Sequence, residues 1–267
     1  MNPRERALEV LCLADPTAKA TQTRSLFETL TADAIDPQAE FDAPSDLPGR
    51  PARPRLVHPK LVPTRSPFTP SGRAALLHAI AHIEFNAINL ALDAVWRFAN
   101  MPHAYYRDWL HVASEEALHF TLLREHLQTL GHDYGDFDAH DGLWLMCERT
   151  AGDVLARMAL VPRTLEARGL DATPPMQAKF AQAGDARAVA ILGIILRDEV
   201  GHVAVGNRWY RWLCARDRLD AEAHYPVLAR RHAAPRLRAP FNLDARRAAG
   251  FSEAELAALE QAIPTLP

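Results

Sequence analysis

The sequence Glu116-Ala117-Leu118-His119 recurs in altered form as Glu199-Val200-Gly201-His202, and each copy lies in a long amphipathic stretch. A glutamate and a histidine three residues apart lie one turn apart on an α-helix, so their side chains reach a common point. Two further inward-facing glutamates would complete a set of four carboxylates and two imidazoles. Such a set is typical of a pair of iron or manganese ions held between the helices of a four-helix bundle.

The two motifs belong to an approximate internal duplication. Glu84 precedes Glu116 by 32 positions, and Glu166 precedes Glu199 by 33 positions. Each half therefore reads as a glutamate followed, at nearly the same distance, by Glu-x-x-His. Two docked helical hairpins of this kind would bring six side chains to the same depth of a bundle: Glu84, Glu116, His119, Glu166, Glu199 and His202.

Apolar periodicity predicts an all-α chain. The predicted helices cover residues 72–100, 103–130, 143–168 and 185–217, with a short helix at 176–183. Ser71 is the expected N-cap of the first. Pro162 is expected to kink the third, which Gly169 would end because Pro174-Pro175 blocks its continuation.

The chain is expected to comprise three regions. Residues 1–70 hold short helices near Arg4–Leu13 and Gln22–Leu30 and then a proline-rich stretch, which is either a solvated linker or, as its interspersed apolar residues favour, an arm packed on the bundle. Residues 71–217 form the four-helix bundle. Residues 218–267 form an extension of short helices separated by Pro226, Pro235 and Pro240.

The overall composition argues against nucleic-acid-binding, membrane-spanning and disulfide-rich proteins. Of 267 residues, 48% are hydrophobic, and the formal net charge of −3 indicates neither a nucleic-acid nor an anionic-membrane partner. The three cysteines have no CxxC spacing and are expected to be reduced. Neither a signal peptide nor an apolar run of the ~20 residues needed to cross a bilayer is visible. We expect a soluble cytoplasmic protein.

A single Glu-x-x-His is usually a solvated surface pair, so its surroundings matter. Glu84 lies within the apolar stripe of its helix, where an unpaired carboxylate costs several kcal/mol and must be neutral, paired or metal-bound. Several such glutamates at related spacing favour a cation. No candidate ligand is a cysteine, which favours iron or manganese over structural zinc. On the third helix Glu166 has the right separation, and Glu148, 18 residues earlier on the same predicted face, is the alternative.

Other residues receive weaker predictions. Glu115 and Asp198 each precede a motif glutamate and could orient the histidine of the opposite motif; the alternative is that both are exposed acids in helix-surface pairs. Most other histidines are expected at the surface. Arginines of the tail, including Arg246 and Arg247, are expected to form a solvated basic face, with a phosphate-bearing or RNA substrate as the alternative.

At these residues the chain resembles the ferritin-like di-iron carboxylate superfamily over about residues 72–215. The stretches VPRTLEARGLDATP, ILRDEVGHVAVGNRW and APFNLDARRAAGF are similar to an uncharacterised bacterial ferritin-like family. The LEAR segment and the later Glu-x-x-His are also similar to the tRNA-modifying hydroxylase of that superfamily. The resemblance implies a ferritin-like four-helix bundle, two iron ions (with a manganese–iron pair as the alternative) and oxygen chemistry.

We therefore expect an O2-dependent oxygenase, hydroxylase or oxidase, with the metal ligands as its only catalytic groups. A small molecule or a modified nucleoside is the expected substrate, a reductase or ferredoxin the electron donor, and a homodimer the assembly, without a membrane partner. The alternatives are a ferroxidase or iron-binding protein without an organic substrate, and a metal-free helical scaffold.

Overall fold

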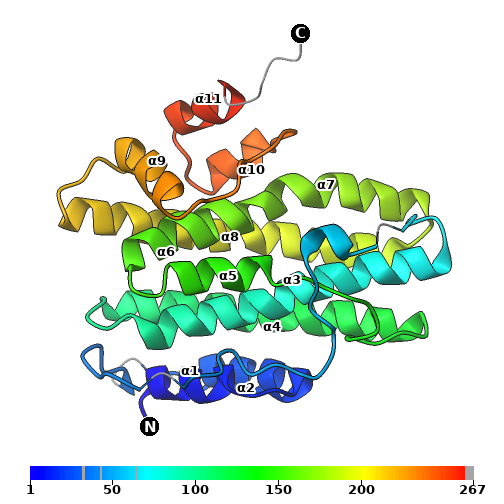
Figure 1. The fold of residues 1–267 in the computed structure, drawn as a ribbon, viewed down its shortest axis with the longest axis horizontal. Coiled ribbons are helices and arrows are strands. Elements are labelled where there is room, and N and C mark those ends of the chain that lie inside the picture. Colours follow the sequence, from blue (N-terminus) through cyan, green and yellow to red (C-terminus); the bar gives the residue numbers. More distant parts are fainter. Residues whose placement is uncertain (32–33, 43, 64, 262–267) are drawn as a thin grey trace. The chain divides into compact units, whose positions relative to one another are not determined.

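The computed structural model describes residues 1–31, 34–42, 44–63 and 65–261, and these residues form an all-helical protein (Figure 1). Within those ranges the extended pairing is limited to one isolated parallel bridge between Leu56 and Ala139. The chain divides into two compact units. Unit 1 contains residues 1–145 and 179–191, and unit 2 contains residues 146–178 and 192–267.

Unit 1 is built on a hairpin of two long helices, α3 (Pro70–Arg97) and α4 (His103–Thr129). The shorter helices α1 (Pro3–Leu11) and α2 (Pro16–Glu28) pack against this hairpin (Figure 1). The apolar stripes predicted for α3 and α4 supply the core, in which Leu77, Ile88 and Leu123 are fully buried. Amphipathic periodicity therefore located this hairpin to within a few residues.

Local capping sets the ends of the hairpin helices. Thr69, and not the predicted Ser71, is the N-cap of α3: its hydroxyl accepts a hydrogen bond from the backbone N–H of Gly72, and Pro70 occupies the first helical position. Gly131 follows α4 with a φ of 79°, the left-handed conformation that commonly ends a helix.

The proline-rich segment belongs to unit 1 and is joined to helix α1 by hydrogen bonds that involve its backbone. The buried Arg4 guanidinium donates to the carbonyls of Asp36, Pro37 and Ala39. Further along, the N–H of Gly49 donates to Leu11 at 2.9 Å. The segment also contains the short 3-10 helix η2 (Pro59–Leu61).

The third predicted helix is wrong in its extent. Residues 142–182 form α5 (Gly142–Arg149), α6 (Val154–Leu160), a π-helical segment η3 (Val161–Glu166) and α7 (Ala167–Gln182). Gly169 does not end a helix, because α7 continues through Pro174 and Pro175. Pro174 has no N–H for the carbonyl of Leu170, and the side-chain amide of Asn242 donates to that carbonyl instead, at 3.2 Å.

The fourth predicted helix corresponds to α8 (Ala186–Arg216), whose first turn is capped by the Asp185 carboxylate. Three short helices follow: α9 (Ala221–Arg231), α10 (Leu243–Ala248) and α11 (Glu253–Gln261). Pro226 lies inside α9 and does not separate helices as predicted. The core that α10 and α11 share with the rest of unit 2 consists of Ala167, Leu170, Val203, Ala249, Phe251 and Leu256.

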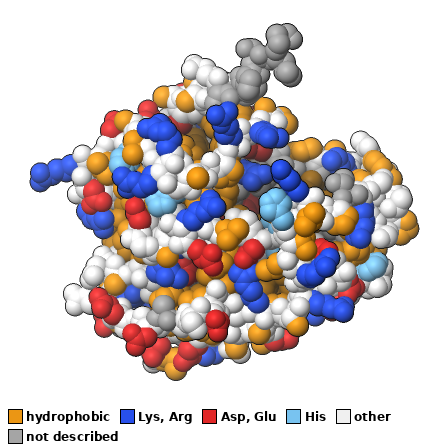
Figure 2. Space-filling model, in the orientation of Figure 1, with side chains coloured by type: hydrophobic (Ala, Val, Ile, Leu, Met, Phe, Trp, Pro, Cys, Tyr) orange, Lys and Arg blue, Asp and Glu red, His pale blue; other side chains and the backbone are white. Residues whose placement is uncertain are grey.

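Among the described residues, α3 is the one helix that is long and apolar enough, by length and composition alone, to cross a bilayer. Of its most apolar window, 78% is buried inside the protein, as is typical of a core helix. Basic and acidic side chains lie interspersed on the face shown in Figure 2. The predicted basic face of the tail is wrong for Arg246, which is fully buried and pairs with Asp171 at 2.6 Å.

Candidate metal centre

Three of the predicted ligands meet inside unit 1. Glu84 extends from α3, and Glu116 and His119 extend from α4, one turn apart. His119 Nδ1 lies 3.3 Å from a carboxylate oxygen of Glu84 and 3.3 Å from one of Glu116. One ligand atom from each residue can be chosen so that all three lie within 4.8 Å of one another. These three residues form what we call the first ligand group.

Burial gives the first ligand group its electrostatic character. Glu84 is 3% exposed, and Glu116 and His119 are 0% exposed. Burial raises the pKa of the Glu84 carboxyl above its ordinary value, the neighbouring Glu116 raises it further, and His119 lowers it in part. Two carboxylates and one imidazole without contact with water are costly unless protons or a cation offset the negative charge.

The donor atoms of this group suit a divalent transition ion. Carboxylate oxygens and an imidazole nitrogen are the ligands that iron and manganese accept, and the atoms here lie close enough for one ion to contact all three. The chain's buried cysteines, Cys147 and Cys214, are not among them. Buried glutamate and histidine side chains of this protein can therefore bind a metal ion.

The other three predicted ligands lie in unit 2. Glu199 and His202 extend from α8, are 7% and 1% exposed, and place a carboxylate oxygen and Nδ1 4.0 Å apart. Glu166 is the last residue of η3 and is 8% exposed. A Cβ on Gly169, one turn after Glu166, would lie 3.9 Å from the Glu199 carboxyl carbon. We call Glu166, Glu199 and His202 the second ligand group.

Glu148 and Glu166, the two candidates for the ligand on the third predicted helix, differ in burial. Glu148 is exposed on α5, whereas Glu166 is buried. The inference that they share one helical face is wrong, because α5 ends at Arg149 and a turn precedes α6. Burial therefore favours Glu166.

The two acids next to the motif glutamates have neighbours on their own helices. Glu115 lies 3.6 Å from His111 Nε2, one turn away on α4. Asp198 pairs with the adjacent Arg197 at 2.8 Å. Their assignment to the histidine of the opposite motif stays a prediction.

A buried polar cluster in unit 1, which was not predicted from the sequence, contains His82, Asn86 and Tyr134. Most histidines outside the two motifs were expected at the surface, but His78, His82 and His126 are buried. Burial lowers the pKa of His82 to about 4, and its Nδ1 lies 2.8 Å from the Tyr134 hydroxyl. The signal that could have revealed the cluster is the helical spacing of His82, Asn86 and Asn89 within an apolar helix.

A small cavity adjoins this cluster. It has a volume of about 30 Å³ and is lined in part by Arg50, His82, Asn86 and Tyr134.

Comparisons with known proteins agree with one another. The family described as "Protein of unknown function (DUF455)" matches residues 12–257. A Haemophilus influenzae protein that carries only the description "Uncharacterized protein" is 48% identical over 254 residues, which cover 91% of this chain and 88% of that protein. No solved structure matches the chain. Because the family model spans most of its length, the chain belongs to the DUF455 family of proteins of unknown function.

Proposed function

We propose that the protein binds two iron ions and uses them with O2 to oxidise an organic substrate. The observation that carries the proposal is the first ligand group: two carboxylates and an imidazole from two core helices, fully or almost fully buried and within reach of one ion. Structural helix–helix contacts do not require such a group, since apolar side chains of similar volume pack at lower cost.

The second ligand group supports a dinuclear centre. The recurrence of Glu-x-x-His, each time about 32 residues after a glutamate, is inferred to reflect two equivalent halves that each supply ligands to one of two neighbouring ions. This joining of the halves is a proposal from the sequence. It agrees with the ferritin-like resemblance, which we also retain as a proposal for the bundle.

The chain's residues would hold and tune the ions. Glu84, Glu116, Glu166 and Glu199 would balance the positive charge, and His119 and His202 would each complete the coordination of one ion. Two bound iron ions would supply the electrons that reduce O2. The apolar side chains around Glu84, such as Ile80 and Ile88, exclude water from this half of the site.

The substrate and partners extend the same proposal. A small molecule or a modified nucleoside would be oxidised, a reductase or ferredoxin would return the iron to its reduced form, and the chain would assemble as a homodimer in the cytoplasm. Glu115 and Asp198 would orient the ligand histidines across the two motifs.

The test is anaerobic loading of the purified protein with Fe(II), followed by iron analysis and exposure to O2. We expect two iron ions per chain and an optical spectrum typical of coupled ferric ions after oxidation. Continued O2 consumption in the presence of a reductant supports an oxidase or oxygenase, whereas accumulation of ferric iron beyond two ions per chain supports the ferroxidase alternative. A protein that takes up no transition ion would overturn the proposal in favour of a metal-free scaffold.

A further inference from the structure

The π-helical segment η3 determines where Glu166 lies. A π turn contains one more residue than an α turn, so each residue after it is rotated by about 100° relative to an uninterrupted α-helix. Such segments are rare and occur frequently at functional sites. Glu166 is the last residue of η3, and its direction therefore depends on whatever keeps the segment in this conformation.

Three contacts made by Thr164 and Pro162 hold η3 within unit 2. The Thr164 hydroxyl donates to the carbonyl of Ala159 at 2.7 Å and lies 2.8 Å from the Tyr225 hydroxyl on α9. Pro162 packs directly on α8 at Gly206, where an added Cβ would lie only 2.5 Å from the proline Cβ. These contacts fix both sides of Arg163, the residue between them.

Arg163 is a buried cation at the centre of η3. It is 3% exposed, and its guanidinium lies over the rings of three aromatic side chains, at 5.0, 4.6 and 4.9 Å from the centroids of Tyr210, Tyr225 and Phe251. Burial lowers the pKa of Arg163, but a guanidinium stays charged in proteins. A buried positive charge is costly unless a negatively charged group is held in place beside it.

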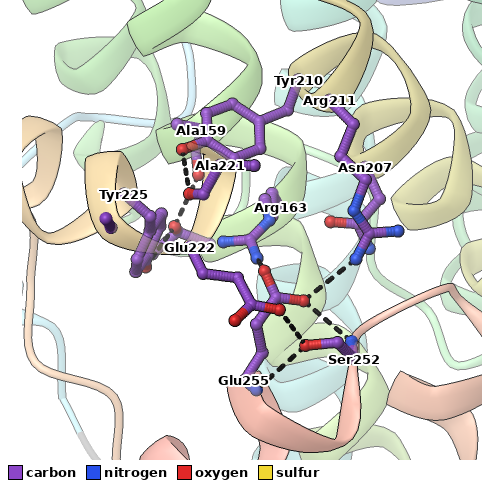
Figure 3. Close-up of polar contacts among 12 residues, drawn as sticks. Ala159, Arg163, Asn207, Tyr210, Arg211, Ala221, Glu222, Tyr225, Ser252 and Glu255 are labelled. Carbon is purple, nitrogen blue, oxygen red and sulfur yellow. Dashed lines mark hydrogen bonds and ion pairs between the residues drawn. The ribbon is translucent and has the colours of Figure 1, made fainter. Parts of the chain in front are cut away.

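Glu255 on α11 is that partner (Figure 3). Its carboxylate pairs with Arg163, 92 residues earlier in the chain. The same carboxylate accepts hydrogen bonds from Arg211 Nη2 at 3.1 Å and from the Ser252 N–H at 2.8 Å (Figure 3). Three groups therefore hold the Glu255 carboxylate in place: Arg163, Arg211 and the Ser252 N–H. Through its ion pair with Arg163, the carboxylate also restrains η3.

We propose that Glu255 is a positioning residue for the second ligand group: by holding Arg163 it keeps η3 π-helical and Glu166 directed for metal binding. The inference rests on the proposed function, because it takes Glu166 as a metal ligand. It assigns the C-terminal helix α11 a role in the metal site although α11 supplies no ligand.

The chain offers a matched control. Glu253 lies on the same helix, two residues before Glu255, and pairs with Arg247 at 2.6 Å as an exposed surface pair. Glu253→Gln removes the same charge from α11 without touching Arg163. Glu255→Gln and Glu253→Gln can therefore be compared in the full-length protein.

Two measurements compare the conformation of η3 and the metal affinity in these variants. Hydrogen exchange of the metal-free proteins should show faster exchange at residues 161–167 in Glu255→Gln only. Titration with Co(II), followed by its visible absorption spectrum, should show affinity for one of two ions weakened by about tenfold or more in Glu255→Gln, as is usual when support of a ligand is lost. The other ion should bind as in the wild type, and Glu253→Gln should change neither reading.

A double variant covers the case in which Glu255→Gln does not fold. Arg163→Met with Glu255→Met removes both charges at once and should restore folding, yet the weakened ion and its altered Co(II) spectrum should persist because η3 is no longer held. Wild-type exchange and wild-type Co(II) affinity in Glu255→Gln would overturn this proposal alone. A wild-type protein that binds no metal would overturn it together with the proposed function.

Discussion

The two ligand groups differ in what positions them. Glu84, Glu116 and His119 extend from the regular helices α3 and α4, whose faces follow directly from apolar periodicity. Glu166 of the second group ends a π-helical segment between two α-helices. All three members of the first group extend from regular helices, as do Glu199 and His202 of the second, whereas Glu166 lies at the end of a segment whose neighbours are far away in the chain.

A glutamate needs different structural support in a regular helix and in a π-helical segment. A regular helix presents residues one turn apart on one face without further help, because its geometry is the same in every protein. A π segment competes with a more stable α-helix and persists only where tertiary contacts favour it. Variants that act on one region and not on the other test the comparison.

The largest expected effect is loss of a direct ligand from the first group. Glu116→Gln should weaken binding of at least one metal ion by about 100-fold or more, since even residues that only support ligands change affinity by about 10–100-fold. The metal-free variant should unfold at the same temperature as wild type or higher, because it removes a carboxylate that raises the pKa of Glu84. Metal titration and thermal unfolding check both points, with the exposed Glu125→Gln on α4 as the control. Unchanged metal affinity would exclude Glu116 as a ligand.

The next prediction concerns the pH dependence of stability that a buried lysine of unit 1 should cause. Lys19 on α2 is fully buried, and its ammonium donates to Asn89 Oδ1 at 2.6 Å and to the Gly49 carbonyl at 2.8 Å. Burial lowers the pKa of Lys19 from 10.5 to about 7. Between these two pH values the unfolded chain binds a proton that the folded chain has lost, so stability should rise with pH.

The rise should be at most about 1.4 kcal/mol per pH unit, and it should be absent below pH 7, where both states are protonated. Denaturant unfolding at several pH values measures it. Lys19→Met should remove this pH dependence, whereas Lys179→Met, at an exposed lysine on α7, should keep it. A wild-type stability that does not change between pH 7 and 10 would show that Lys19 stays charged in the fold.

A third prediction compares two glycines of α8. Gly206→Ala places a methyl group against Pro162 of η3 and should lower the free energy of unfolding by about 1–3 kcal/mol, as overpacking usually does. Gly201 has no neighbouring atom within 4 Å of its added Cβ, so Gly201→Ala should stabilise by up to about 1 kcal/mol through helix propensity. Chemical denaturation of both variants measures the contrast. Equal effects would contradict close packing of η3 on α8.

The smallest expected effect is at Asn242, which precedes α10. Its side chain caps that helix through the N–H of Ala245 and also donates to the Leu170 carbonyl that Pro174 leaves without its usual donor. Asn242→Ala should cost about 1–2 kcal/mol, the loss of one cap and one hydrogen bond. Asn242→Asp keeps the cap and removes the donor, so it should lie between wild type and alanine in a thermal unfolding series. An alanine variant as stable as wild type would show that α7 tolerates Pro174 without this contact.

The sequence by itself determined the helical class, the α3–α4 hairpin, the long helix α8 and the burial of the six candidate ligands. Each of these follows from apolar periodicity and from residues three or four positions apart, which neighbouring side chains alone can set. Glu166 was predicted from its spacing and is buried, although the helix predicted around it was wrong, and its role as a ligand stays a prediction.

Only the tertiary structure decided the course of residues 142–182. Gly169, Pro174 and Pro175 are local signals to end a helix, and α7 nevertheless continues through them, with Asn242 donating to the Leu170 carbonyl that Pro174 leaves without its helical donor. The π segment likewise depends on Gly206 and Glu255, which lie more than 40 positions away. Contacts at such separations leave no periodic trace in the residues they stabilise, since the free energy that selects the conformation comes from elsewhere in the chain.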